Sequence, residues 1–469
     1  MHEHLIKVAV VGHPSEGKSS VIATLAERDD IRISARSPET RECHSYDIQV
    51  GNQTLLELID TPGFQRPREA CAEFKLYEER IGTDNIAATF LAEHGQDPRF
   101  DAERKILTPL AEGAGLIYVV DASRPISKDD RHEVEILRLT GRPRLAVINA
   151  KADESTHMDA WYALLNSTFN LVRPFNAHRA SFAERMDLLR ALGQLEKSWQ
   201  TDIDAIIAAF QVDWQARMDE CAEAILDCIE AIVLLRVAKT CNADDRREKE
   251  RVAQQVADSY REKCAKRERE CHQAIRRAFK HQLFDPAPVT ELQHGLLDEE
   301  TWRLLGLNSR QLRRALMMTG AALGLTADVA LAGVSLGVGT GTGAAAGYLM
   351  GRYAMQPLSM LRAHTRKDSW LSRSMRREIY LGPARNLQIV FVLLDRALGC
   401  AHLARNWTHA RRDHESIMVT RPTAATKEWS QVDRDAISRY HVAILKGSSE
   451  QVYERRTAVR ELLVKLLAS

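Results

Sequence analysis

The feature that most constrains the fold of this chain is the octapeptide at residues 12–19, GHPSEGKS, which matches G-x-x-x-x-G-K-[ST]. It follows an apolar run at residues 5–11 that is typical of a buried strand, and it precedes a helical pattern. Glycines let backbone N–H groups surround a phosphate, and the helix N-terminus adds partial positive charge. We therefore expect a phosphate-binding loop in which Lys18 contacts phosphate oxygens and Ser19 is a ligand of Mg²⁺. The residues of this loop are Gly12, His13, Pro14, Ser15, Glu16, Gly17, Lys18, Ser19 and Ser20.

Two later segments complete the expected phosphate and metal site. Asp60-Thr61-Pro62-Gly63 ends an apolar run, LLELID, so Asp60 is placed to hold a metal ion and the Gly63 N–H to contact a γ-phosphate. Between this motif and the loop, SPETR at residues 37–41 offers the hydroxyl of Thr40, unless the segment is an ordinary polar turn. The sequence thus predicts Mg²⁺ as cofactor, with Ser19, Thr40 and Asp60 as its ligands.

The element that would recognise the base is irregular. A guanine site requires N-K-x-D, in which the Asp accepts hydrogen bonds from the base; Lys151 and Asp153 have this mutual spacing. Ala150, however, occupies the Asn position, and Asn149 lies one residue early. Ala177, within FNAH at residues 175–178, offers a backbone contact to the guanine oxygen. We expect GTP and GDP as ligands, with Asn149, Lys151, Asp153 and Ala177 at the base.

Short apolar runs at residues 55–59, 116–120, 145–148 and 171–175 alternate with helical segments. Such alternation predicts an α/β domain with a doubly wound, mostly parallel sheet. Residues 195–283 then run almost without Pro or Gly, and their apolar residues follow helical spacing, which predicts a mainly α-helical C-terminal region.

The motifs GHPSEGKSS, PETR, DTPGF and the KAD end of NAKAD resemble the Era/TrmE-type branch of translation-factor-class GTPases over about residues 5–180. The whole chain resembles a proteobacterial family of uncharacterised GTPases with a helical C-terminal domain of unknown function. That wider resemblance rests on the imperfect guanine motif, on DEETWRLLGL (298–307) and on TADVALAGVSLGVGTGTG (326–343). From these motifs together we expect a Mg²⁺-dependent GTPase that acts as a nucleotide-controlled switch for a helical effector module.

This chain departs from the pattern of that branch at Ser15, where the Era/TrmE type usually has Asn. A Ras-type enzyme places a water-orienting Gln directly after D-x-x-G, whereas this chain has Phe64 there, followed by Gln65. We therefore expect slow intrinsic hydrolysis, and no water-positioning catalytic residue is identified from the sequence.

The resemblance and the composition together suggest four parts. We expect a P-loop GTPase domain at 1–185 with an insertion at about 64–114, long charged helices at 186–312, a glycine-rich hydrophobic helical hairpin at 313–356 and a helical domain at 357–469. The insertion is either a nucleotide-coupled lid over the site or a surface elaboration. Cysteines spaced seven apart, such as Cys264 and Cys271, indicate a buried helix face rather than a zinc site.

Charge and hydropathy set limits on partners. Lys and Arg number 65 and Asp and Glu 64, a net charge of +1, which argues against a dedicated nucleic-acid coat or a polybasic membrane binder. Within residues 315–351 the only charged residue is Asp328, glycines recur every four residues, and arginines flank both ends. The segment is either a hairpin packed inside protein, which we favour, or a membrane contact.

The sequence predicts a cytoplasmic protein, with a peripheral position at the inner membrane as the variant if the glycine-rich segment contacts lipid. Two alternatives to the switch hypothesis remain open: a membrane-associated or scaffold protein with little turnover, and a ribosome- or RNA-associated GTPase. A homodimer or a protein partner is favoured over RNA, because the basic residues are balanced by acidic ones.

Overall fold

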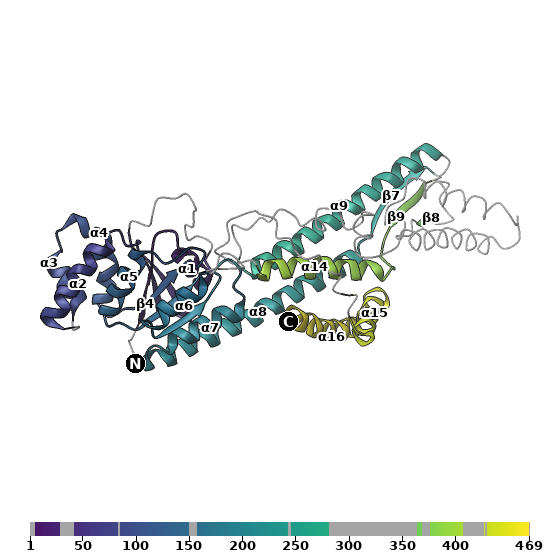
Figure 1. Ribbon diagram of the computed structural model, residues 1–469. Helices are drawn as coiled ribbons and strands as arrows, with labels where there is room; N and C mark the ends of the chain where they lie inside the picture. Colours follow the sequence, from purple (N-terminus) through teal and green to yellow (C-terminus); the bar gives the residue numbers. More distant parts are fainter. Residues whose placement is uncertain are drawn as a thin grey trace, which may run out of the picture. The chain divides into compact units, whose positions relative to one another are not determined.

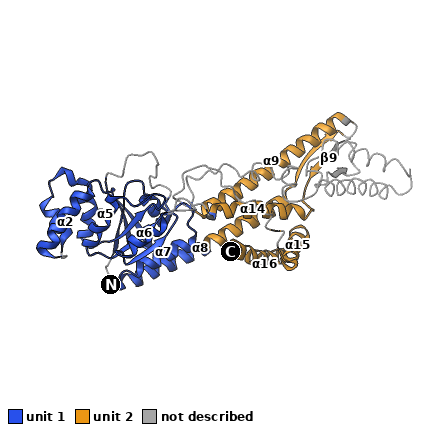
Figure 2. Cartoon of the chain, viewed as in Figure 1, with its two compact units in different colours: residues 1–215, 280–283, 405–413 blue, residues 216–279, 284–404, 414–469 orange. Residues whose placement is uncertain are grey.

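The computed structural model describes residues 5–28, 42–82, 85–149, 157–242, 245–280, 364–367, 376–406, 426 and 429–468 (Figure 1). These residues form two compact units: the first contains the described residues up to Gln215 together with Lys280, Arg405 and Asn406, and the second contains the others (Figure 2). The expected site residues Thr40, Lys151 and Asp153, and the glycine-rich segment 315–351, lie outside the described residues. Each unit is described by itself below.

The first unit is built on a six-stranded sheet with the strand order β2-β3-β1-β4-β5-β6. All neighbouring strands are parallel except β2 and β3, which form an antiparallel hairpin. The strands are β1 (Ile6–Val11), β2 (His44–Val50), β3 (Gln53–Asp60), β4 (Gly115–Val120), β5 (Arg144–Ile148) and β6 (Leu171–Pro174). Because the parallel strands all end at one edge of the sheet, the loops after β1, β3, β4 and β5 lie together there.

Helices cover both faces of this sheet. Side chains of β1 alternate between two apolar cores, since successive residues of a strand point to opposite faces. Val8 and Val10 pack with α1 (Lys18–Ala26), α7 (Phe182–Gly193) and the start of α8 (Gln200–Val233). Ala9 and Val11 pack in the other core, which is formed with α2 (Pro67–Ile81), α3 (Ile86–Glu93), α4 (Asp101–Ala111), α5 (Lys128–Leu139) and α6 (Met158–Asn166).

The structure confirms the predicted α/β class and the mostly parallel sheet, and it adds the strand β2, which the sequence did not reveal. In β2 only Ile48 is buried, because the strand lies at the edge of the sheet and most of its side chains face solvent. Such a strand shows no continuous apolar run of the kind that marks the buried central strands. Its turn to β3 is made at Gly51, whose φ is +61°.

Between β3 and β4 the chain forms the helices α2, α3 and α4, which lie grouped together beside the sheet (Figure 1). An aromatic cluster holds this group: the ring centroids of Phe74 and Phe90 are 5.4 Å apart, and those of Phe90 and Phe100 are 5.1 Å apart. Helix α4 also places Ile106 and Leu107 in the core against the sheet. We refer to residues 64–114 below as the insertion.

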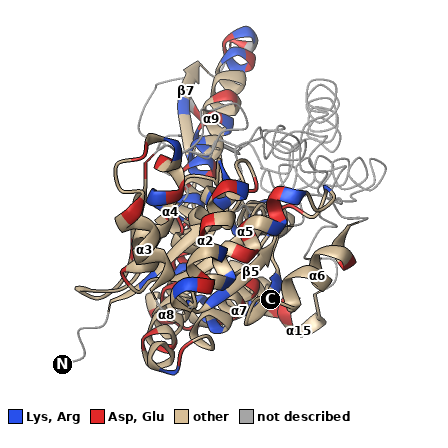
Figure 3. Ribbon diagram, turned by 60° about the vertical axis from the view of Figure 1, so that its left-hand side comes forward, with Lys and Arg blue, Asp and Glu red and all other residues tan. Residues whose placement is uncertain are grey.

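The second unit is mainly helical, as predicted. It contains the rest of α8 together with α9 (Arg246–Ala278), α14 (Gln388–Asn406), α15 (Gln431–Lys446) and α16 (Ser449–Ala468). Charges of both signs alternate along α9 (Figure 3). Its described residues also include a three-stranded antiparallel sheet in the order β7-β9-β8, formed by β7 (Val237–Asn242), β8 (His364–Lys367) and β9 (Arg376–Leu381).

The interior of the second unit contains buried thiols and one buried ion pair. Burial raises the pKa of Cys264 and of Cys400 to about 12, so both are neutral thiols of the core. Burial also lowers the pKa of His272 to about 4, which keeps its imidazole uncharged. Arg396 and Glu268 pair in this interior, and each is only 6% exposed. Among the described residues, no helix combines the length and the apolar character that crossing a membrane requires.

Candidate functional site

The loop after β1 has the backbone geometry that phosphate binding requires. Gly12 and Gly17 have φ angles of +150° and +102°, which side chains rarely permit. A Cβ on Gly12 would lie 2.3 Å from the carbonyl oxygen of Val119, so glycine is also required by the packing of the loop on β4. Lys18, in the first turn of α1, donates to the carbonyl oxygens of Gly12 and His13, both at 3.1 Å. Its ammonium group therefore lies over the loop.

Ser19 and Asp60 connect this loop to the end of β3. The Ser19 hydroxyl donates to Asp60 Oδ2 at 2.6 Å, and Asp60 is only 3% exposed. Burial raises the pKa of Asp60, against the opposing effects of Ser19 and Lys18. Within the described residues, Asp60 Oδ1 is buried and has no hydrogen-bond partner. A hydroxyl and a carboxylate with a free oxygen are hard donors of the type that Mg²⁺ prefers, so these residues fit the expected ion.

Gly63 packs directly on the phosphate-binding loop. A Cβ at this position would lie 2.4 Å from Cδ of Pro14 and 2.7 Å from its backbone nitrogen. Phe64 is only 2% exposed and points into the core, so its side chain does not reach the site. Gln65, the next residue, is exposed. The main chain after β3 therefore touches the loop at Gly63 and is anchored in the core one residue later.

Asn149, directly after β5, joins the loop to the segment expected at the base. Its side chain is fully buried; Nδ2 donates to the carbonyl oxygen of Glu16 at 3.0 Å, and Oδ1 accepts from the Ala177 N–H at 3.3 Å. The Ala177 carbonyl in turn accepts from Thr24 of α1 at 2.9 Å. Although Asn149 is one residue early in the sequence motif, the structure places it between the phosphate loop and Ala177.

The Glu16 side chain binds protein groups. Its carboxylate accepts from the Asp121 N–H and from Arg124 Nε, the latter at 2.7 Å. Burial raises the pKa of Glu16, while Arg124 opposes this shift. Arg124 also makes bidentate contacts to Asp130 of α5, both at 2.7 Å; these bonds lower the pKa of Asp130 although burial works against them. Glu16 is thus held within a charged cluster, and its contribution to phosphate binding would come from its backbone.

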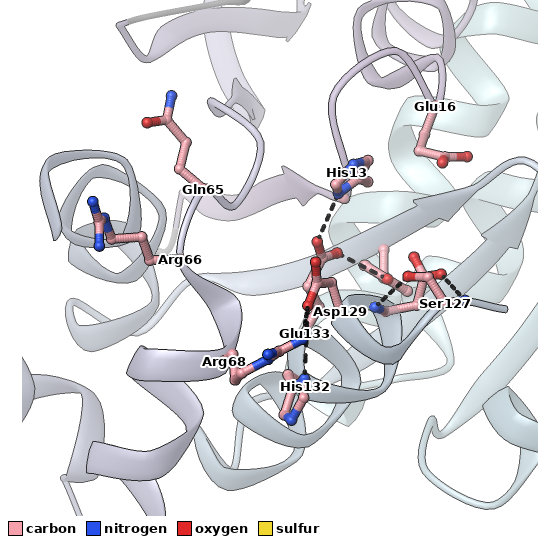
Figure 4. Close-up of polar contacts among 12 residues, drawn as sticks. His13, Glu16, Gln65, Arg66, Arg68, Ser127, Asp129, His132 and Glu133 are labelled. Carbon is pink, nitrogen blue, oxygen red and sulfur yellow. Dashed lines mark hydrogen bonds and ion pairs between the residues drawn. The ribbon is translucent and has the colours of Figure 1, made fainter. Parts of the chain in front are cut away.

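His13 likewise points to α5. Its Nδ1 lies 3.1 Å from Oε1 of Glu133, whose other oxygen accepts from the Tyr118 hydroxyl at 3.0 Å (Figure 4). The hydrogen bond to Glu133 raises the pKa of His13, and burial raises the pKa of Glu133. One turn earlier on the same helix, Asp129 lies 3.9 Å from Arg68 of α2 (Figure 4). Helix α5 therefore contacts both the phosphate loop and α2.

The structure brings together most of the residues that the sequence indicated: the loop from Gly12 to Ser20, Asp60, Gly63, Asn149 and Ala177. Sequence reasoning did not find the partners on α5, nor Glu103 of α4, which is fully buried and bonds to the backbone after Phe64. No local pattern marks them, because each partner is separated from the loop it contacts by tens of residues.

Comparisons with known proteins divide the chain in two. A family model described as a 50S ribosome-binding GTPase matches residues 7–150. A second model, described as a domain of unknown function, DUF3482, matches residues 162–468. Both matches confirm the resemblances drawn from the motifs, and with them the GTPase class of the α/β unit.

The curated relatives match about a third of this chain. GTPase Der of Paraburkholderia phymatum is 25% identical over 142 residues, 30% of this chain and 26% of that protein. GTPase Era of Carboxydothermus hydrogenoformans is 26% identical over 142 residues, 30% of this chain and 38% of that protein. The chain therefore spans about a quarter to two-fifths of the length of these relatives.

Similar solved structures include Era in complex with MgGDPNP and nucleotides 1506–1542 of 16S ribosomal RNA. This structure has 17% identity and a TM-score of 0.30, and the match covers 41% of this chain and 57% of that one. A probable GTP-binding protein engB has 19% identity and a TM-score of 0.23, with 43% of this chain and 98% of that one covered.

Proposed function

Because this chain belongs to the DUF3482 family and its N-terminal unit is a P-loop GTPase domain, we propose that it hydrolyses GTP slowly and acts as a nucleotide-controlled switch for its helical C-terminal region. The observation that carries this proposal is the 2.6 Å contact between the Ser19 hydroxyl and Asp60, beside an Asp60 oxygen that is buried and has no hydrogen-bond partner among the described residues. This contact joins the phosphate loop to the segment that contains Gly63. In this proposal, a nucleotide bound at the phosphate loop therefore influences the position of the segment that contains Gly63.

The roles of the site residues follow from their positions. Backbone N–H groups of residues 12–18, apart from Pro14, which has none, would surround the phosphates, and Lys18 would add a positive charge. Ser19 and Asp60, with Thr40 as the further expected ligand, would hold Mg²⁺, which would neutralise phosphate charge. Asn149 fixes the Ala177 backbone, whose N–H and carbonyl groups both bond to protein partners rather than to a base, and Lys151 and Asp153 would recognise guanine in this proposal.

Slow turnover follows from the residue that comes after Gly63. Phe64 is buried in the core and has no polar group with which to orient a water molecule. Correct placement of the attacking water then depends on how the following main chain is held, and on contacts that a partner supplies. We therefore propose a switch whose state lasts long enough to be read by a partner.

Nucleotide binding by the full-length chain tests the proposal. Fluorescent GTP and GDP should bind in Mg²⁺, and Lys18→Ala should lower affinity by at least about tenfold, since one charged phosphate contact contributes about 1.5–3 kcal/mol. The matched control is Lys197→Ala, at an exposed position of the same unit, which should bind as the wild type does. Equal displacement of labelled GTP by ATP and by GTP would contradict the guanine assignment.

A ribosome-associated role is the second candidate, and it rests on the family model that matches residues 7–150, which is described as a 50S ribosome-binding GTPase. Co-sedimentation of the chain with ribosomes in the presence of a non-hydrolysable GTP analogue, but not of GDP, would support it. Absence of the chain from the ribosomal pellet in both states would leave the protein-switch hypothesis.

A further inference from the structure

Helix α4 of the insertion contacts two segments that lie before and after the metal-site residue Asp60 in the sequence. On one side, Lys105 Nζ donates to Glu42 at 2.8 Å, and the Lys105 carbonyl accepts from the Cys43 thiol at 3.4 Å. Glu42 and Cys43 lead into β2. On the other side, Glu103 contacts the loop between β3 and α2. One short helix, separated from both segments in the sequence, therefore touches both.

The contact made by Glu103 is the more specific of the two. Its Oε1 accepts from the backbone N–H groups of Gln65 and Arg66, at 2.8 and 2.5 Å, although Glu103 is fully buried. These amides directly follow Gly63 and Phe64, the residues that pack on the phosphate loop and in the core. Bonds between a carboxylate and backbone N–H groups are stronger than neutral ones, because the acceptor is charged.

A purely structural explanation accounts poorly for this arrangement. Helix α2 begins at Pro67, and its own N-cap residue, Arg66, provides no side-chain cap. A Ser or Asp at that position would cap the helix locally. Instead, the N–H groups of the two residues before the helix bond to Glu103, 37 positions from Arg66, and the second oxygen of Glu103 is buried without a hydrogen-bond partner among the described residues. A buried and incompletely paired carboxylate is costly, so its presence calls for a further reason.

We propose that Glu103 is a positioning residue for GTP hydrolysis: it fixes the main chain after Gly63, and thereby the place where the attacking water is held. This inference rests on the proposed GTPase function. Since Phe64 cannot orient water, the position of the main chain beyond it matters, and the contacts from Glu103 to Gln65 and Arg66 set that position. Through this contact of helix α4, the rate of hydrolysis depends on the insertion.

The test compares the wild type with Glu103→Ala and Glu103→Gln in the full-length chain. Hydrogen exchange, read by mass spectrometry, should show the Gln65 and Arg66 amides exchanging at least tenfold faster in Glu103→Ala. Glu103→Gln, whose amide oxygen can accept both bonds, should remain close to the wild type. Single-turnover hydrolysis should fall at least tenfold in Glu103→Ala and less than threefold in Glu103→Gln. The dissociation constant for GDP should stay within threefold in both variants.

The matched control is Arg104→Ala, because Arg104 bonds to Asp101 and to the Gly95 carbonyl, both within the insertion. It should leave both the exchange at Gln65 and the hydrolysis rate unchanged. The proposal is overturned if exchange accelerates while hydrolysis does not change, or if hydrolysis and GDP affinity fall together. If the wild type neither binds nor hydrolyses GTP, the proposed function fails, whereas the exchange measurement still reports on the Glu103 contact.

Discussion

Replacement of Asn149 by alanine tests whether this residue holds the phosphate loop and the base segment together. The side chain is fully buried and bonds to the Glu16 carbonyl at 3.0 Å and to the Ala177 N–H at 3.3 Å. Its removal leaves two buried backbone groups without partners. Each such group costs about 1–3 kcal/mol, so the free energy of unfolding should fall by about 2–6 kcal/mol. The loss lies near the lower end of this range if water enters the gap and bonds to the two groups.

Asn149→Ala should also weaken nucleotide binding, because without the two Asn149 hydrogen bonds Ala177 shifts relative to the phosphate-binding loop. If only about 1.4 kcal/mol of this loss reduces the free energy of nucleotide binding, affinity falls about tenfold. We therefore expect the dissociation constant for GDP to rise by at least that factor. Urea denaturation with and without GDP identifies the transition that belongs to the nucleotide-binding unit, and Asn149→Ala should move that transition to lower urea.

Two further variants sharpen this test. Asn149→Asp keeps an acceptor for the Ala177 N–H but places a buried carboxylate opposite the Glu16 carbonyl, so it should be about as damaging as alanine. Asn166→Ala removes the same side chain at an exposed position of α6 and should change stability by less than about 0.5 kcal/mol. The reasoning is refuted if Asn149→Ala leaves both the GDP-sensitive transition and the GDP affinity unchanged.

Three other predictions concern charged groups. Asp60→Asn should raise the Mg²⁺ concentration needed for GTP binding at least tenfold in a titration; a Mg²⁺ dependence like that of the wild type would contradict the assignment of Asp60. The folded His13–Glu133 pair holds its proton more tightly than the unfolded chain does, since the pKa of both groups is raised. The pair should therefore stabilise the protein at pH 6 and lose this effect as the pH rises through the raised pKa of His13. In thermal melts, Glu133→Gln should flatten the dependence of the melting temperature on pH over this range. An unchanged dependence would show that the pair does not contribute to stability. Arg396→Met should destabilise the second unit by about 3–5 kcal/mol, because Glu268 is left as an unpaired buried charge, and adding Glu268→Leu should restore most of the loss in denaturation curves.

The core of the site could be predicted from the sequence because its requirements are local. Gly12 and Gly17 adopt backbone angles that favour glycine, and Lys18 and Ser19 lie in the first turn of a helix whose start the strand-loop pattern marks. Asp60 ends a buried strand that the apolar run LLELID reveals. The parallel sheet then brings these strand ends to one edge, so even the meeting of distant motifs follows from the topology.

The irregular parts could not be predicted in the same way. The edge strand β2 and the strand β7 each bury few residues, so neither shows the apolar pattern of a central strand. The role of Asn149 was obscured by an offset of one residue in the motif, and only its bonds to Glu16 and Ala177 show where its side chain lies.

The sequence by itself therefore determined that this chain has a phosphate-binding loop on an α/β fold, since backbone conformation and strand burial leave local patterns. Only the tertiary structure decided what surrounds that loop. It placed the Glu16 and His13 side chains against α5, and it brought Glu103 to the backbone of Gln65 and Arg66. Such contacts depend on how the helices of the insertion and α5 pack against the sheet, and packing joins residues that no sequence spacing connects.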